Sequence, residues 1–431
     1  MFKTKPPIKL ERDASQYLPY ARHVNDHMVA LDDGEFMAVF ALDGIAFETA
    51  DIATINDWHE KLNGAWRTIA HERVAVYLHT VRRIERGYLD GDFRSGFARE
   101  LDAAYKARVL SKRMFVNEHF LTVIYRPAIG AADKAAHSIF SMFNKATAAE
   151  AEDDIIEAFT DILRDTEKLM GRVNPRLLRT YEHNGLQFSE PLELMQRIMT
   201  ADRRRVPLVR AHLGRAIYSD RVIFGSEILE IREPGGSRFG GILAVREHAA
   251  RTYPGQLNAL LESKFEFVLG QSFAFLGKQN GMETARRKRA QLSATDDVAY
   301  SQAEHLDEAM DDLQSNRFVL GEHHLALTVF GETPKILAEN MSIARAALSE
   351  SGIVAAREDL ALEAAYWSQL PGNFTWRTRP AALTSRNFAA LAPVHTYPVG
   401  QREGNHWGDA IALLKTTANS PYFFNFHSAD V

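Results

Sequence analysis

The sequence predicts an α+β fold of two lobes, each a small and mainly antiparallel sheet backed by helices, loosely ferredoxin-like. A chain of 431 residues is longer than a domain with one hydrophobic core usually is. Its composition of 46% hydrophobic and 25% charged residues is typical of globular domains. Short runs of β-branched and aromatic residues alternate with segments whose apolar residues recur at helical spacing. The second half repeats this order of elements, although the residues themselves show no repeat.

Residues 1–33 are expected to form an N-terminal arm, and residues 34–200 the first lobe. Apolar runs bounded by turn residues predict strands at 36–42, 74–81 and 120–125, and a weak strand at 177–186. Apolar residues at helical spacing predict helices over 52–69, 93–105, 155–170 and 192–199. Trp58 and Trp66 lie two turns apart on the first helix, which favours core packing over a binding platform.

The second predicted helix of this lobe carries a regular aromatic and aliphatic stripe. Phe93, Phe97, Leu101 and Tyr105 are four residues apart and therefore share one helix face. Residues 128–150 are rich in Ala, Lys and Ser, and they are expected to form a flexible excursion before the third helix.

Residues 201–358 are expected to form the second lobe. The predicted strands lie at 227–231, 239–245, 265–276, 325–330 and 353–355. Thr333-Pro334 predicts the start of a helix that ends before Gly352, and Pro254 predicts the start of a shorter one. Residues 282–315 are expected to form one long polar helix or a helical hairpin, basic at its start and acidic later.

Residues 359–406 are expected to form a short amphipathic helix and then an extended linker rich in Pro, Asn, Gly and Thr. Trp367, Trp376 and Trp407 indicate that this linker packs down onto the lobes. Residues 407–431 predict two strands joined by the turn Asn419-Ser420-Pro421. Because this tail is apolar and aromatic, it is expected to pack partly on its own chain and to leave an apolar edge.

Composition excludes several classes of function. The chain has no cysteine, which excludes disulfides, thiolate catalysis and zinc bound by cysteine. A formal net charge of -5 argues against generic nucleic-acid binding. The N-terminus has no apolar core of a signal peptide, and the longest uncharged apolar run, 267–277, is shorter than the ~20 residues of a membrane span. Membrane association is therefore expected to be peripheral or through a partner.

No catalytic, cofactor-binding or metal-binding residue is predicted. The sequence contains no Gly-x-x-x-x-Gly-Lys-Ser/Thr, and the nearest fragment, Gly277-Lys278-Gln279, lacks both the first glycine and the Ser/Thr for Mg²⁺. His323 and His324 are adjacent on a predicted strand and point to opposite faces, so they are interpreted as structural. Ser272 lacks the second glycine of a nucleophile elbow and is interpreted as a buried strand serine.

Two further features have competing interpretations. The glycines at 235–236 and 240–241 lie in and beside a predicted hairpin, which explains them without a dinucleotide site. A basic run is the candidate contact patch for phospholipid headgroups or nucleic acid, with a solvated helix face as the alternative; it consists of Arg286, Arg287, Lys288 and Arg289.

Five stretches carry a resemblance to a known family. They are Leu18-Pro19-Tyr20 with His23, and the segments 255–275, 321–331, 360–373 and 407–427. In these stretches the chain resembles the large ATPase of type IV secretion and conjugation systems, the CagE/TrbE/VirB family, and the resemblance runs along essentially its whole length. The segments at 321–331 and 407–427 are the most specific.

The resemblance implies an N-terminal docking and assembly domain of an ATPase that energises pilus biogenesis and the transfer of DNA or protein. Residues 407–431 would begin a RecA-like motor that is absent from this chain, so ATP and Mg²⁺ are implied for the full-length protein and no cofactor for this chain, which is expected not to hydrolyse ATP. The implied partners are other secretion subunits at the bacterial inner membrane and further copies, as a hexamer or a dimer-based assembly. The implied location is cytoplasmic and peripheral to that membrane.

A second class of function stays open beside this one. A free-standing soluble enzyme with an unrecognised active site would need an ordered pocket in which titratable groups converge.

Overall fold

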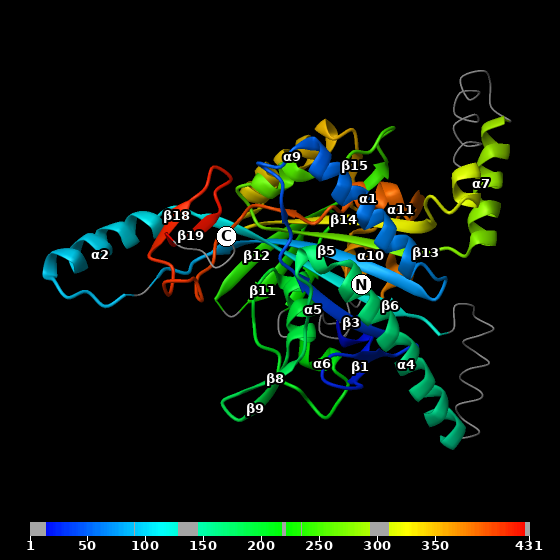
Figure 1. Cartoon of the computed structure of the whole chain (residues 1–431), viewed down its shortest axis with the longest axis horizontal. Helices are drawn as coiled ribbons and strands as arrows, with labels where there is room; N and C mark the ends of the chain where they lie inside the picture. The colour runs from blue at the N-terminus through cyan, green and yellow to red at the C-terminus, as the bar shows by residue number, and fades with distance from the viewer. Residues whose placement is uncertain are drawn as a thin grey trace, which may run out of the picture.

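The computed structural model describes residues 14–89, 91–127, 145–217, 221–233, 235–293 and 310–426. The chain forms one large antiparallel sheet covered by helices on both faces (Figure 1). The order of the strands across the sheet is β1 (Tyr20–His23), β2 (Val29–Leu31), β3 (Phe36–Leu42), β6 (Met114–Tyr125), β5 (Val74–Glu85), β13 (Phe267–Phe275), β14 (Leu320–Gly331), β12 (Gly236–Glu247), β11 (Leu229–Glu233) and β10 (Arg221–Phe224).

Several short strands complete the arrangement. Three short strands pair with interior strands of the large sheet, outside this order: β15 (Val354–Arg357) beside β12, β16 (Ala381–Thr384) beside β14, and β7 (Arg176–Leu177) beside β3. Three separate pairs are β17 (His395–Thr396) with β4 (Ile45–Ala46), β18 (Ala412–Lys415) with β19 (Pro421–Phe424), and β8 (Thr180–His183) with β9 (Leu186–Ser189).

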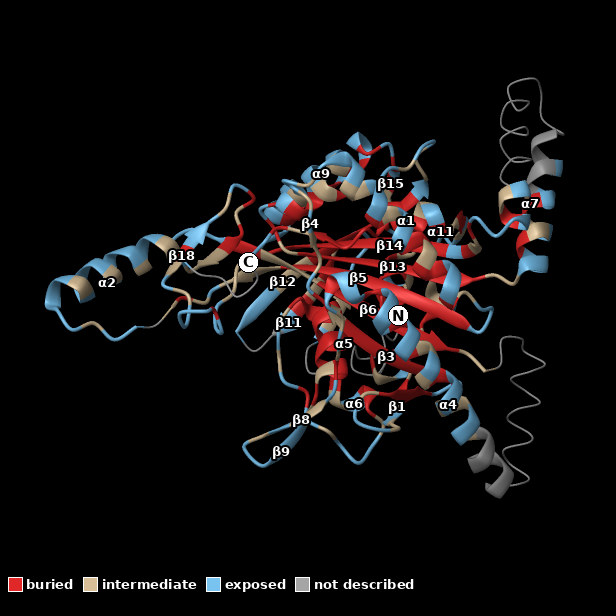
Figure 2. Ribbon diagram, viewed as in Figure 1, coloured by how far each residue is buried: buried red, intermediate tan, exposed pale blue. Residues whose placement is uncertain are grey.

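Alternation along the strands creates two cores. In β5, Val76 and Leu78 face one core while Tyr77 and Val81 face the other, because successive side chains of a strand point to opposite faces. The first core is covered by α1 (Ile52–Ile69), α4 (Lys145–Leu169), α9 (Pro334–Glu350) and α11 (Ser385–Leu391). The second core is covered by α5 (Glu190–Thr200), α6 (Gly214–Ile217) and α10 (Leu362–Ser368). Burial on both sides explains the nearly continuous apolar runs of the central strands (Figure 2).

The expectation of two lobes with separate small sheets is wrong. β5, from the first predicted lobe, pairs antiparallel with β13, from the second, in a register from Arg82 opposite Phe267 to Ala75 opposite Ala274. Each small sheet would leave an apolar edge strand with unpaired backbone groups, and pairing of these two edges removes both. The coarser prediction of an α+β fold with antiparallel pairing is confirmed, while neither the ferredoxin-like nor the RecA-like description is.

The boundary between β5 and β13 relates two similar halves. Outward from it, the order is β5, β6, β3 on one side and β13, β14, β12 on the other. In each half these are the second, third and first of the three strands along the chain, so the repeated element order expected from the sequence is present in the sheet. A helix follows the third strand in both halves, α4 after β6 and α9 after β14, and both helices cover the same core.

Most predicted elements are close to the observed ones. β3 has the predicted bounds, and α1 buries Trp58 and Trp66 as expected. The residues after Pro254 form a short 3-10 helix (Asn258–Glu262). Residues 20–31, assigned to the N-terminal arm, contribute β1 and β2 to the sheet. The boundaries proposed for the domains remain predictions.

Two helices stand apart from the cores. α2 (Gly96–Leu110) and α7 (Lys278–Ser293) follow β5 and β13, and they extend at opposite ends of the molecule (Figure 1). The expected excursion at 128–150 falls largely outside the described residues, and so does the middle of the polar segment expected at 282–315. Among the helices of the described ranges, none combines the length and the apolar composition that a membrane crossing requires.

Candidate functional site

The predicted basic patch lies on α7, and the structure describes half of its side chains. Arg286 and Arg287 are exposed, whereas the side chains of Lys288 and Arg289 lie outside the described residues. The Arg287 guanidinium donates to the Glu283 carboxylate at 2.9 Å, one turn earlier on the same helix. Such an exposed intrahelical pair is typical of a solvated helix face. The patch therefore remains a prediction, with its solvated alternative still open.

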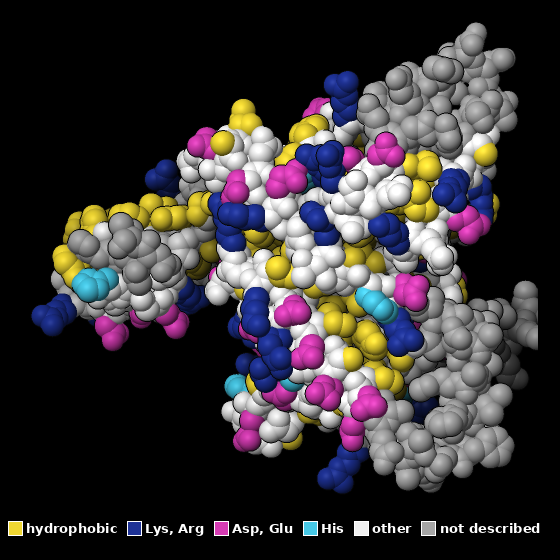
Figure 3. Space-filling model, turned by 45° about the vertical axis from the view of Figure 1, so that its right-hand side comes forward, with side chains coloured by type: hydrophobic (Ala, Val, Ile, Leu, Met, Phe, Trp, Pro, Cys, Tyr) yellow, Lys and Arg dark blue, Asp and Glu magenta, His cyan; other side chains and the backbone are white. Residues whose placement is uncertain are grey.

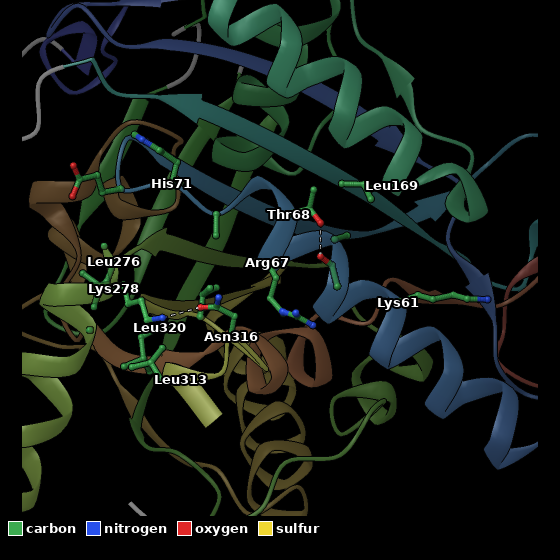
Figure 4. Close-up of a pocket in the computed structure, with 17 residues that line it drawn as sticks. Lys61, Arg67, Thr68, His71, Leu169, Leu276, Lys278, Leu313, Asn316 and Leu320 are labelled. Carbon is green, nitrogen blue, oxygen red and sulfur yellow. Dashed lines mark hydrogen bonds between the residues drawn. The ribbon is translucent and has the colours of Figure 1, made fainter. Parts of the chain in front are cut away.

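A pocket of about 830 Å³ lies between α1, the start of α7 and the segment leading into β14 (Figure 4). Leu276, Leu313 and Leu320 contribute apolar surface, and Arg67 and Lys278 contribute positive charge. Lys278 Nζ donates to the Gln314 carbonyl at 2.9 Å. This hydrogen bond holds the segment before β14 against the start of α7. The pocket could accept a small ligand that is part apolar and part anionic.

The lining of this pocket resembles a catalytic site only weakly. Its acidic lining residue is Glu72, and Figure 4 shows the lining side chains on separate elements around the opening instead of converging on one point. Within the described ranges, no three residues among His, Cys, Asp and Glu are placed to hold a metal ion. The lining of this pocket gives no specific support to the alternative of a free-standing enzyme.

The histidine pair of β14 is buried, as its structural interpretation requires. His323 Nε2 lies 3.1 Å from the Gln271 amide oxygen, to which it donates, and the His323 ring also contacts Phe388. Burial lowers the pKa of His324 to about 4 and lowers that of His323 well below its usual value. Both rings are therefore neutral at pH 7, inside the protein core.

Two other sequence candidates are also structural. Ser272 is buried in β13, the central strand, as predicted. Gly236 opens β12 opposite Glu233 of β11, which confirms the hairpin interpretation of the glycines.

The C-terminal strand pair packs onto α2 and the start of β6. This agrees with the prediction that the tail packs partly on its own chain. Leu413 of β18 is buried against Tyr88 and Met114. The Tyr105 hydroxyl of α2 donates to the Leu413 carbonyl at 2.7 Å, and the Phe115 amide donates to the Asn419 carbonyl at 2.8 Å. We call this unit, residues 86–89 and 91–113 together with 407–426, the projecting arm.

Arg82 fixes the projecting arm to both halves of the sheet. Its buried guanidinium donates to the Ser263 carbonyl at 2.7 Å, to the Asn117 side-chain oxygen at 2.8 Å and to the Ala418 carbonyl at 3.4 Å. It also lies over the Phe115 ring, 4.9 Å from the centroid. Burial lowers the pKa of Arg82 to about 10, which leaves the group charged at neutral pH.

Sequence reasoning missed Arg82 and the exposure of α2. The apolar alternation of β5 ends near Val81, so the two following arginines indicated the end of the strand, whereas β5 continues to Glu85. The stripe of α2 was recognised as one helix face, but its spacing is the same for a buried face and an exposed one. α2 buries none of its side chains, in contrast to α1.

The prediction that the linker packs down is confirmed, but its description as extended is wrong, because it contains β16, α11 and β17. Trp407, which was expected to take part in this packing, is 67% exposed. Trp367 is buried and stacks on Tyr17 with ring centroids 4.6 Å apart. Trp58 Nε1 donates to the Pro393 carbonyl at 2.7 Å, and Phe388 of α11 is buried in the first core. Residues 359–406 are therefore packed against the sheet and its helices.

Two family models match the chain. The model described as "CagE, TrbE, VirB family, component of type IV transporter system" matches residues 176–379. The model described as "Type IV secretion system ATPase VirB4/TrbE, N-terminal domain" matches residues 27–132. The two matches lie in different halves of the sheet and agree on one family.

Curated relatives match nearly the whole chain. The type IV secretion system protein virB4 of Bartonella quintana is 46% identical over 98% of this chain and 54% of its own length. Protein virB4 of Agrobacterium tumefaciens is 39% identical over 98% of this chain and 53% of its own length. The type IV secretion system protein PtlC of Bordetella pertussis is 36% identical over 97% of this chain and 51% of its own length. The chain thus spans about half the length of these relatives.

Proposed function

Because this chain belongs to the CagE/TrbE/VirB family of type IV transporter components, we propose that it is the N-terminal docking and assembly part of a type IV secretion ATPase. In this function it holds the ATPase against the other secretion subunits at the inner membrane, where the complete machine drives pilus biogenesis and the transfer of DNA or protein. In this proposal the chain itself positions the ATPase and makes contacts with other subunits, and it catalyses no reaction.

One observation carries this proposal. The match covers 98% of this chain and 54% of the Bartonella quintana relative, and the printed sequence contains no phosphate-loop motif. A P-loop needs its glycines and its Lys-Ser/Thr pair to cradle phosphates and hold Mg²⁺. We therefore assign ATP and Mg²⁺ to the part of the longer relatives that this chain does not match.

The proposal includes partners and location. Other type IV secretion subunits are the expected partners, and copies of the full-length protein are expected to assemble as a hexamer or from dimers. The expected location is the cytoplasmic side of the inner membrane, with peripheral attachment. The basic patch on α7 remains a candidate for weak contacts there.

Co-purification tests the docking function. The tagged chain, expressed in a bacterium with a working type IV secretion system, should co-purify other secretion subunits from detergent-solubilised membranes and should reduce substrate transfer by competing with the resident ATPase. A Trp66→Asp variant, which places a charge in the first core, controls for the burden of expression. The purified chain should show no ATP turnover above background.

The proposal fails if the folded chain recovers no secretion subunit and leaves transfer unchanged at a level of expression above that of the resident protein. It also fails if the purified chain hydrolyses ATP after contaminating ATPases have been excluded.

A further inference from the structure

The projecting arm exposes large apolar side chains that nothing in the described chain covers. Phe97 and Leu101 of α2 are 77% and 61% exposed, and Trp407 and Phe426 near the terminal strands are 67% and 73% exposed. Figure 3 shows hydrophobic side chains along one side of the arm, from its tip to the main body. Most large apolar side chains of this protein are buried, so apolar side chains exposed on the arm, such as the pair Phe97 and Leu101 on one helix, indicate a contact surface.

The predicted stripe of α2 divides in the structure, because Phe97 and Leu101 are exposed whereas Tyr105 is hydrogen-bonded to β18. Tyr105 and Val109 contact β18 and the residues packed around it, and Asp102 accepts a hydrogen bond from Tyr88 at 2.8 Å. Phe97 and Leu101 lie on the neighbouring face, followed at helical spacing by Ala104 and Arg108. The apolar face is therefore not required for the internal packing of the arm.

Cations outnumber carboxylates along the segment that carries this face. Residues 94–113 contain six Lys and Arg residues but only two carboxylates. Within the described residues, four exposed cations of this segment form no ion pair: Arg94, Arg99, Arg108 and Lys112. Arg113 pairs with Glu332 at 2.7 Å, and Lys106 lies over the Tyr88 ring. The surface thus combines aromatic and aliphatic side chains with an excess of cations.

The excess of positive charge distinguishes between two possible binding partners of this surface, a second copy of the arm and a lipid bilayer. An arm of a second copy would bring the same excess of cations against itself, and like charges repel. An anionic bilayer surface attracts such a segment, since Lys and Arg contact the phosphate groups while Phe, Trp and Leu side chains enter the boundary between headgroups and acyl chains. We propose that the apolar face of α2 binds the surface of an anionic lipid bilayer.

The inference rests on the peripheral membrane location in the proposed function, and it assigns that contact to the projecting arm instead of the basic patch on α7. The arm extends from the main body, so it can reach a surface while both cores stay intact (Figure 1). Because α2 buries none of its side chains, substitutions on its exposed face should leave the fold unchanged.

Vesicle sedimentation with the purified chain of 431 residues tests the inference. The chain should sediment with phosphatidylcholine vesicles that contain about a third phosphatidylglycerol and stay in solution with pure phosphatidylcholine. The variant Phe97→Ser/Leu101→Ser should bind the anionic vesicles about tenfold more weakly or worse, because it removes the side chains that enter the bilayer. The matched control Ile336→Ser/Ile343→Ser removes two exposed apolar side chains of α9 and should bind like the unaltered chain.

Three results would overturn the inference. The first is equal binding by the α2 variant and the unaltered chain, with circular dichroism showing both to be folded. The second is loss of binding in Arg286→Glu/Arg287→Glu but not in the α2 variant, which would place the contact on α7. The third is no vesicle binding but a concentration-dependent dimer that the α2 variant abolishes, which would assign the face to a second copy.

These outcomes are separable from a failure of the proposed function. Co-purification of secretion subunits is measured in detergent, where the bilayer is gone. If co-purification persists while vesicle binding is absent, docking stands and the lipid contact falls.

Discussion

Four buried histidines share one physical situation, although they lie on different strands. Burial lowers the pKa of His79, His119, His324 and His395 to about 4 each. His79 lies 2.8 Å from the Gln369 carbonyl and His119 lies 3.0 Å from the Thr80 hydroxyl, so their partners are neutral groups. A proton on any of these rings would therefore be a buried charge, and at His119 the cost of burial outweighs the attraction of the Glu118 carboxylate.

The stability of the fold should depend on pH accordingly. A native histidine pKa below the unfolded value of about 6.5 means that the unfolded chain binds more protons between these two values. The free energy of unfolding should be highest, with respect to these histidines, above about pH 6.5. It should decrease as the pH drops toward 4. The variant His119→Gln should lower the slope of that free energy against pH by one proton, measured by urea unfolding at a series of pH values.

His406→Gln is the control for this experiment, because the His406 side chain is exposed in the folded protein. An unchanged slope in the His119 variant would show that this ring is not a site of acid sensitivity.

At the scale of elements, the terminal strand pair depends on one side chain of β5. Arg82 contacts the Ala418 carbonyl in the turn between β18 and β19, and it also contacts the residues at the end of the 3-10 helix before β13. A methionine at this position would fill similar space but would remove the donor from two buried carbonyl groups and from the part-buried Asn117 side-chain oxygen. Without the Arg82 hydrogen bonds, the C-terminal strand pair would lose its attachment to the sheet.

Arg82→Met should therefore lower the free energy of unfolding by about 3 kcal/mol or more. Amide hydrogen exchange of Ala412–Phe424 should become faster relative to that of β3, because the strand pair detaches before the sheet unfolds. Arg94→Met, an exposed arginine of the same arm, should change the unfolding free energy by no more than about 0.5 kcal/mol. Unchanged exchange in the Arg82 variant would contradict the role of this residue as the anchor.

The elements also show what the sequence can and cannot predict. Periodicity predicted α1, β3 and the burial of Trp58, because a repeat of 3.6 or 2 residues reports which face is apolar. It could not predict which strand lies next to β5, since pairing of β5 with β13 depends on edges from distant parts of the chain. For the same reason, the stripe of α2 predicted a helix face but not that the face is exposed.

For the whole molecule, the pairing of β5 with β13 joins both halves into one sheet and two shared cores. Val268 in β13 is fully buried at this boundary and belongs to the same core as Val81 of β5. Loss of one half would therefore expose the core of the other. The molecule should behave as one cooperative unit instead of two lobes.

Calorimetry should show a single unfolding transition whose calorimetric and van't Hoff enthalpies agree. Val268→Asp should lower the midpoint of that transition without splitting it, because the buried charge weakens both halves at once. Leu360→Asp changes a fully exposed side chain and should leave the midpoint nearly unchanged. Two resolved transitions in the unaltered chain would contradict the single cooperative unit.

The boundary between β5 and β13 also has a consequence during synthesis. β5 leaves the ribosome long before its partner, since roughly 190 residues separate the ends of the two strands. At about 5–20 residues per second, the edge of β5 waits on the order of 10–40 s for β13. Throughout that interval an apolar strand with free backbone groups is open to pairing with other nascent chains. Production of this protein should therefore depend on chaperones that cover the edge until β13 has emerged.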